Sequence, residues 1–184
     1  MRYSDGPTAE VEILIEATKS EVWALISDPA MPASFSNELE VAAWQDPETA
    51  PGVGSIIEGH NKNPRVGEWD TLSYVSRWEP QECFEWKVGD PSDPFATWRF
   101  ELADGNADSA NNADNAESAD NLGNVTLLRQ WCTIGPARSG VSVAIDARPD
   151  LEEEIVENRM TWHRQNMLHN LEGVRGKLED PRFH

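Results

Sequence analysis

The sequence predicts an α+β domain in which a seven-stranded antiparallel sheet curves around a long C-terminal helix, with two short helices after the first strand. Two patterns carry this prediction. Segments of alternating apolar and polar residues recur between short turns as far as Ile134. An amphipathic stretch with helical spacing then begins at Pro149. The chain has 184 residues, the size of one domain with a full core, so residues 1–184 are expected to form a single domain.

The first strand and the two short helices are predicted from the N-terminal part of the chain. Residues 8–17 alternate between apolar and acidic side chains, which indicates a strand with one face in solvent. Residues 19–27 carry apolar side chains at helical spacing, and Thr18 or Ser20 is the expected N-cap. A further helical turn is expected within residues 30–35.

The remaining strands follow one another with short connections rich in proline and glycine, which favours an antiparallel meander. Six are expected, at residues 39–44, 54–61, 68–78, 83–88, 96–102 and 124–134. Residues 104–121 interrupt the pattern with five acids, no base and no aromatic or β-branched residue. Such a composition buries too little apolar surface to offset its ordering entropy, so we expect a flexible acidic loop.

The last helix is the longest predicted element. Residues 135–148 are interpreted as a long connection, and the helix is expected at residues 149–178 with acids in its first turn. Its apolar stripe recurs at spacings of three and four, so one face should lie on the sheet. The stripe consists of Leu151, Ile155, Val156, Met160, His163, Met167, Leu171, Val174 and Leu178.

The charge excludes two classes of partner. Lys and Arg total 15 against 33 Asp and Glu, for a formal net charge of -18. A nucleic-acid-binding protein needs a basic face, and docking on an anionic membrane needs a polybasic patch. No apolar run approaches the ~18 residues of a membrane span, and the N-terminus has no apolar signal core. We therefore expect a soluble cytoplasmic protein, with no nucleic-acid partner and no stable membrane association.

Motifs for metal, cofactor or nucleophile chemistry are missing from the sequence. Cys83 and Cys132 lack metal-site spacing and are too few for a disulfide framework, so free thiols are expected. His163 and His169 do not share one helix face. Phosphate-binding loops and nucleophile elbows are also absent from the sequence. We expect no metal and no cofactor.

Several stretches of the chain resemble a known superfamily. They are residues 11–17, 22–29, 52–54, 59–61, 69–71 and 84–86. The sequence is similar to the SRPBCC superfamily, whose helix-grip fold is shared with START lipid-transfer domains and the birch pollen allergen, and it most resembles the polyketide cyclase/dehydrase-like proteins. The resemblance implies a ligand cavity between sheet and helix. It leaves the activity open, because carriers, enzymes and chaperone partners share this scaffold.

His163 is the candidate catalytic residue, because it lies on the apolar stripe between Met160 and Met167. It is either a core histidine satisfied by one hydrogen bond or a polar contact in a ligand cavity that acts as general acid or base. The two methionines would give the helix side of the cavity a deformable surface.

The walls of the cavity are expected from Trp69, Trp86 and Trp98 on consecutive strands. Trp86 and Trp98 share the parity of the neighbouring phenylalanines and should face the long helix, either as core or as the wall of an apolar pocket.

Polar residues with inward parity are candidates for orienting a ligand: Asn61, Thr71 and Gln130. The parity of the last strand is ambiguous. If the alternative register holds, Arg129 replaces Gln130 on the inward face and would bind a carboxylate.

Three functions are compatible with these residues. The first is binding of a hydrophobic or aromatic small molecule, or a lipid, in the internal cavity. The second is a polyketide cyclase or dehydratase reaction with His163 as acid or base. The third is a protein-interaction module, which needs an exposed apolar patch. The oligomeric state is left open.

Overall fold

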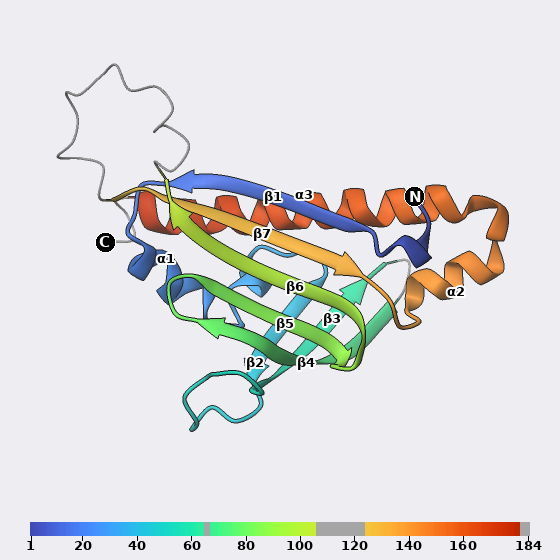
Figure 1. Cartoon of the computed structure of the whole chain (residues 1–184), viewed down its shortest axis with the longest axis horizontal. Coiled ribbons are helices and arrows are strands. Elements are labelled where there is room, and N and C mark those ends of the chain that lie inside the picture. Colours follow the sequence, from blue (N-terminus) through green and yellow to red (C-terminus); the bar gives the residue numbers. More distant parts are fainter. Residues whose placement is uncertain (65–66, 106–123, 181–184) are drawn as a thin grey trace, which may run out of the picture.

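The computed structural model describes residues 1–64, 67–105 and 124–180. Seven antiparallel strands form one sheet, in the order β1-β7-β6-β5-β4-β3-β2. The sheet curls around a long C-terminal helix, as predicted (Figure 1). The strands are β1 (Thr8–Ile15), β2 (Leu39–Trp44), β3 (Ile56–Asn63), β4 (Gly67–Glu79), β5 (Cys83–Asp90), β6 (Asp93–Asp104) and β7 (Thr126–Ile134).

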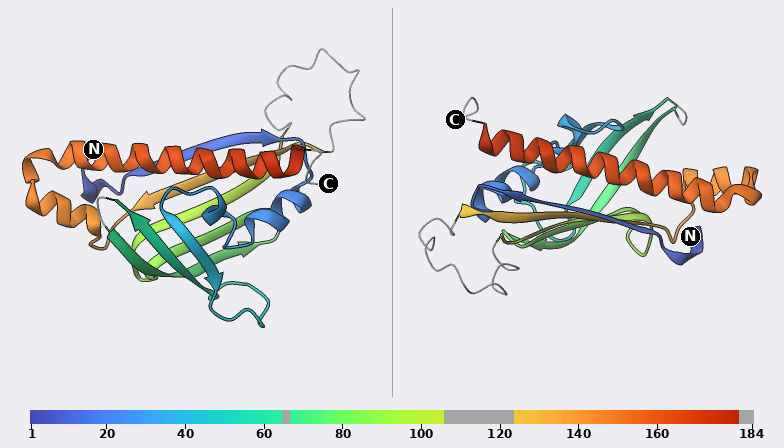
Figure 2. Two further views of the ribbon diagram at one scale, coloured as in Figure 1. Left: turned by 180° about the vertical axis from the view of Figure 1, so that it is seen from behind. Right: turned by 90° about the horizontal axis from the view of Figure 1, so that it is seen from above.

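The helices cover one side of the sheet. They are the short 3-10 turns η1 (Tyr3–Asp5), η2 (Pro32–Ser34) and η5 (Pro149–Leu151), and the α-helices α1 (Lys19–Ile26), α2 (Gly140–Ala147) and α3 (Glu152–Glu179). Figure 2 shows α3 lying along β1 and β7, while β2, β3 and β4 turn toward it on the other arm of the sheet. Within the described residues, no helix combines the length and apolar character needed to cross a lipid bilayer.

The segment after β1 carries the chain from one edge of the sheet to the other. Helix α1 begins with a capping box in which Thr18 Oγ1 accepts from the Glu21 amide and the Glu21 carboxylate accepts from the Thr18 amide. Of the two predicted N-caps, Thr18 is therefore the one used. The turn η2 fills the helical turn expected at residues 30–35, and the chain then enters β2 at the far edge.

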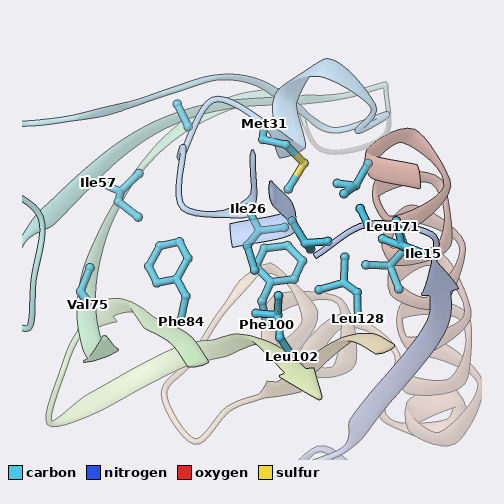
Figure 3. Close-up of a cluster of buried hydrophobic side chains, with 14 residues drawn as sticks. Ile15, Ile26, Met31, Ile57, Val75, Phe84, Phe100, Leu102, Leu128 and Leu171 are labelled. Atoms are coloured by element: carbon cyan, nitrogen blue, oxygen red, sulfur yellow. The ribbon is translucent and has the colours of Figure 1, made fainter. Parts of the chain in front are cut away.

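Two apolar clusters lie between the sheet and α3. In the main core, Leu171 of α3 points toward Ile15 of β1 and Leu128 of β7 (Figure 3). The second cluster lies under α2 and the first half of α3. It consists of Ala9, Cys132, Ile134, Val156, Met160 and Met167, with Trp98 packed against it. The predicted stripe of α3 therefore faces the sheet.

The register of β7 resolves the ambiguity left by the sequence. Even-numbered residues of β7 are buried, and Gln130 is 2% exposed on the concave face. Arg129 lies on the outer face, where its guanidinium binds Glu12 at 2.8 Å and Glu10 at 3.3 Å. The alternative with Arg129 inside is wrong, because the acids of β1 hold its charge in solvent.

The structure differs from the sequence prediction in the connection before α3 and in the ends of several strands. The connection 135–148 contains α2, capped by Ser139, whose hydroxyl accepts from the Val141 amide. Val141 and Ile145, one turn apart, lie against the second cluster, and this packing stabilises a helix that was expected to be a loop. Strand β6 extends to Asp104, and the expected acidic loop at 104–121 otherwise lies almost wholly outside the described residues.

Candidate functional site

A row of three polar side chains lies on the buried face of α3. His163, Asn166 and Asn170 are 5%, 8% and 6% exposed, and their spacing of three and four keeps them on the stripe that faces the sheet. The sequence analysis identified only His163. Asn166 and Asn170 were missed, although the same helical spacing could have found them.

His163 is packed against an aromatic ring on the sheet. The indole of Trp98 meets the imidazole edge to face, with 4.9 Å between ring centroids. Burial holds the pKa of His163 well below its usual range, and the positive charge of Arg159 lowers it further. The ring is therefore neutral at pH 7, and a general-base role would have to rely on a weak base.

Asn170 faces the predicted ligand residue Gln130 across the core. Its Nδ2 donates to Gln130 Oε1 at 3.5 Å. Its Oδ1 is buried and has no hydrogen-bond partner within the described residues. Buried acceptors are normally paired, so this oxygen marks a place where a partner fits.

The aromatic residues of the concave face divide between the two clusters. Trp86 and Trp98 are direct neighbours across β5 and β6, on the inward face as predicted. Trp86 stacks at 4.8 Å from Phe84 and 5.7 Å from Phe100 in the main core. The predicted deformable residues Met160 and Met167 lie with Trp98 in the second cluster. Together they form an apolar wall beside His163.

The predicted residues of β3 and β4 form a separate group on the other arm of the sheet. Asn61 Nδ2 donates to Thr71 Oγ1 at 3.3 Å, and that hydroxyl donates to the Gly59 carbonyl at 3.4 Å. A side chain on Gly59 would come within 2.7 Å of the Thr71 hydroxyl, so glycine is needed for this contact. Trp69 is the cross-strand neighbour of Asn61 and is half-buried. Within the described residues, no hydrogen bond, ion pair or ring contact joins this group to His163.

A pocket of about 850 Å³ opens at the end of this arm. None of the predicted site residues lines it, although Leu39 in its wall pairs with Asn61. Its lining comes from η2, the start of β2 and the β3–β4 hairpin, and consists of Ala33, Ser36, Asn37, Glu38, Leu39, Glu40, Lys62, Asn63, Pro64, Gly67 and Glu68.

Residues 35–38, here called the strap, separate this pocket from the buried face of α3. The Asn37 amide donates to Asn166 Oδ1 at 3.2 Å. The Glu38 carboxylate, 9% exposed, accepts from the Arg159 guanidinium at 3.1 Å and from the Trp162 indole at 2.8 Å. The Lys177 ammonium nitrogen lies over the Phe35 ring, 5.2 Å from the ring centroid. The strap is thus held to α3 along its length, and its Asn37 touches both the pocket and the polar row.

The polar row of α3 can form hydrogen bonds among buried apolar side chains. Within the described residues, no group of three His, Cys, Asp or Glu side chains is arranged to hold a metal ion. Among the residues that the structure describes, Glu38 is the only buried carboxylate, and its charge is already bound by Arg159.

Comparisons with known proteins agree with this architecture. Residues 7–174 match the family model described as polyketide cyclase / dehydrase and lipid transport. No curated protein matches the chain. Among solved structures, a polyketide-cyclase-like protein from Corynebacterium glutamicum, determined by NMR in solution, is 26% identical with a TM-score of 0.57, and the match covers 96% of each chain.

Two more distant structures share the fold. An aromatase/cyclase from a Streptomyces species is 14% identical with a TM-score of 0.61, covering 94% of this chain and 93% of that one. A START superfamily protein from Mycobacterium smegmatis is 9% identical with a TM-score of 0.58, covering 94% of this chain and 97% of that one. Because the family model spans nearly the whole sequence, this protein belongs to the polyketide cyclase/dehydrase and lipid transport family, within the helix-grip superfamily that its sequence resembles.

Proposed function

We propose that this protein binds a hydrophobic or aromatic small molecule between the curled sheet and α3, with the pocket behind the strap as the way in. The family includes lipid transport in its description, which supports a carrier. The inward aromatic side chains would supply apolar walls, and a few neutral polar groups would orient the ligand.

The observation that carries the proposal is that one residue of the strap, Asn37, contacts both the pocket and the buried polar row. Asn37 lines the pocket and donates to Asn166, and Asn170 follows one turn further along the same face of α3. Movement of the strap would therefore expose polar groups that already face the core. Met160 and Met167, both fully buried beside this row, can change rotamer to admit a ligand at low cost.

The test is the detection of a bound molecule and its loss when the enclosed space is filled. Native mass spectrometry of freshly purified protein should show a co-purified small molecule. Met167→Trp adds bulk on the buried face and should abolish this adduct. Leu168→Trp adds the same indole at the next position, which is 40% exposed, and should retain the adduct. Equal retention by both variants would contradict an internal ligand.

A second candidate is a cyclase or dehydratase reaction, which the family description also includes. A Streptomyces relative of this fold is named an aromatase/cyclase. Here His163 would be the acid or base that acts on a carbonyl compound bound against Trp98. Turnover of a model poly-β-ketone, lost in His163→Ala and retained in His169→Ala, would favour the enzyme over the carrier. Binding without turnover would favour the carrier.

A further inference from the structure

Asn170 has a feature that folding alone does not explain. Its Oδ1 is buried in a side chain that is 6% exposed, and within the described residues it accepts no hydrogen bond. Burying an amide oxygen without a donor costs free energy, and a leucine of similar shape would avoid that cost. The amide nitrogen donates to Gln130 Oε1, which leaves the oxygen as the free end.

The charges around the polar row restrict what can bind there. No lysine or arginine is buried within the described residues. Arg129 and Arg99 lie on the outer face of the sheet among glutamates. Arg159, whose charge lowers the pKa of His163, is bound by Glu38 of the strap. An anionic group beside Asn170 would therefore have no cation to compensate its burial.

We infer that the ligand of this site is a neutral hydrophobic molecule whose hydroxyl group donates a hydrogen bond to Asn170 Oδ1, and that free carboxylic acids are excluded. The inference rests on the proposed function and adds the chemical class of the ligand. The apolar surfaces of Trp98 and Met167 would contact the hydrocarbon part, while Asn170 and Gln130 select for the hydroxyl.

Three naphthalene probes of similar size test this selection. 2-Naphthol is neutral at pH 7 and carries the donor, 2-methoxynaphthalene lacks the donor, and 2-naphthoate carries the negative charge. Isothermal titration calorimetry with the full-length protein should rank 2-naphthol first. One hydrogen bond to a buried acceptor should make it roughly ten-fold tighter than the methyl ether. The carboxylate should bind roughly a hundred-fold more weakly than the naphthol, or not at all.

Asn170→Leu removes the acceptor and should abolish the preference, so that naphthol and its methyl ether bind about equally. Gln165→Leu makes a similar change on the exposed face of the same helix and should leave the ranking unchanged. Asn170→Leu removes the unpaired Oδ1 but also the Nδ2 that donates to Gln130 Oε1, so one buried acceptor is lost and another is left unpaired. These two changes offset each other, and the variant should melt within about 4 °C of the wild type.

The outcomes separate the inference from the proposed function. Saturable binding of all three probes with equal affinity, or tighter binding of the carboxylate or the ether, overturns the inference and leaves the internal binding site standing. A preference for the naphthol that survives in Asn170→Leu overturns the assignment to Asn170. If none of the three probes binds saturably, the proposed function is contradicted, and the inference with it.

Discussion

The imidazole of His163 stands edge to face against the indole of Trp98, with 4.9 Å between the ring centroids and 82° between the planes. This contact joins the middle of α3 to the middle of β6, where the imidazole is 5% exposed. A charged imidazolium would lose its hydration there, and Arg159 adds a repelling charge. The folded state therefore favours the neutral form of His163 over the protonated form.

The first prediction is a dependence of stability on pH that originates at His163. Its folded pKa is lowered, whereas the unfolded chain takes up a proton near pH 6.5. The unfolded state therefore binds more protons as the pH falls below about 6.5, and the native state loses stability in that range. The effect should reach at most about 1.4 kcal/mol per pH unit between about pH 6.5 and pH 5. Urea unfolding in this window should show a shallower pH dependence for His163→Gln.

His60 provides the control, because its pKa is displaced in the opposite direction. A hydrogen bond from its ring to Asp70 at 2.7 Å, with help from neighbouring acids, raises the pKa of this exposed histidine. The stability that protonated His60 contributes is present at low pH and is lost as the pH rises through its raised pKa. His60→Gln should therefore retain the loss of stability below pH 6.5. An unchanged slope in His163→Gln would contradict burial of a neutral ring.

The order of elements could be predicted because each has a local pattern. Alternation identified the strands, and the stripe from Leu151 to Leu178 identified α3. Helix α2 was missed because its β-branched residues Val141, Val143 and Ile145 alternate as in a strand, whereas packing of Val141 and Ile145 stabilises a helix.

The candidate site was predicted only in part, for a physical reason. In β7, residues of both parities are apolar, so the strand alone could not choose between Arg129 and Gln130; the acids on neighbouring β1 decide it. The Glu38–Arg159 pair joins residues 121 positions apart, and no local pattern reports such a contact. The pocket behind the strap brings residues 33–40 together with residues 62–64 and 67–68, and no local sequence pattern reports that contact either.

The second prediction concerns this ion pair. The Glu38 carboxylate is 9% exposed, and Arg159→Met would leave it the Trp162 indole as its one side-chain donor among the described residues. Because the Glu38 charge then stays buried without its partner, the free energy of unfolding should fall by about 2–3 kcal/mol, somewhat less than for a fully buried pair. The double variant Glu38→Leu, Arg159→Met should recover most of the loss.

Arg164→Met is the matched control on the same helix. Arg164 meets Glu157 at 3.8 Å, and both side chains are largely solvated. Its loss should change the free energy of unfolding by less than about 0.5 kcal/mol in the same denaturation experiment. Similar losses for Arg159→Met and Arg164→Met would show that the strap is not held by its buried carboxylate.

The third prediction is slow thiol chemistry. Cys83 and Cys132 are unpaired and buried on opposite faces of the sheet, separated by β6. Burial raises the pKa of Cys83 to about 11 and that of Cys132 to about 12. Thiolate is the reactive form, so a disulfide reagent at pH 8 should label the native protein slowly and Cys83 first.

Unfolding in denaturant without reductant should release two reactive thiols per chain. Cys83→Ser should remove the faster of the two native phases and leave one thiol in denaturant. Rapid labelling of both thiols in the native state, or a count of zero after unfolding, would contradict the arrangement.

The fourth prediction compares two glycines of α3 with opposite surroundings. A Cβ on Gly173 would come within 2.4 Å of the Phe35 ring of the strap, whereas a Cβ on Gly176 would meet nothing within 4 Å. Replacing glycine by alanine in an open helix stabilises by about 0.5–1 kcal/mol, so Gly176→Ala should raise the melting temperature. Gly173→Ala should lower it, because displacing a packed ring costs about 1–3 kcal/mol. In a Phe35→Ala background the penalty at Gly173 should disappear, since the two changes share one contact. Stabilisation by both alanines in the wild-type background would show that the strap does not rest on α3 at this point. The Phe35–Gly173 contact could then not be what separates the pocket from the polar row.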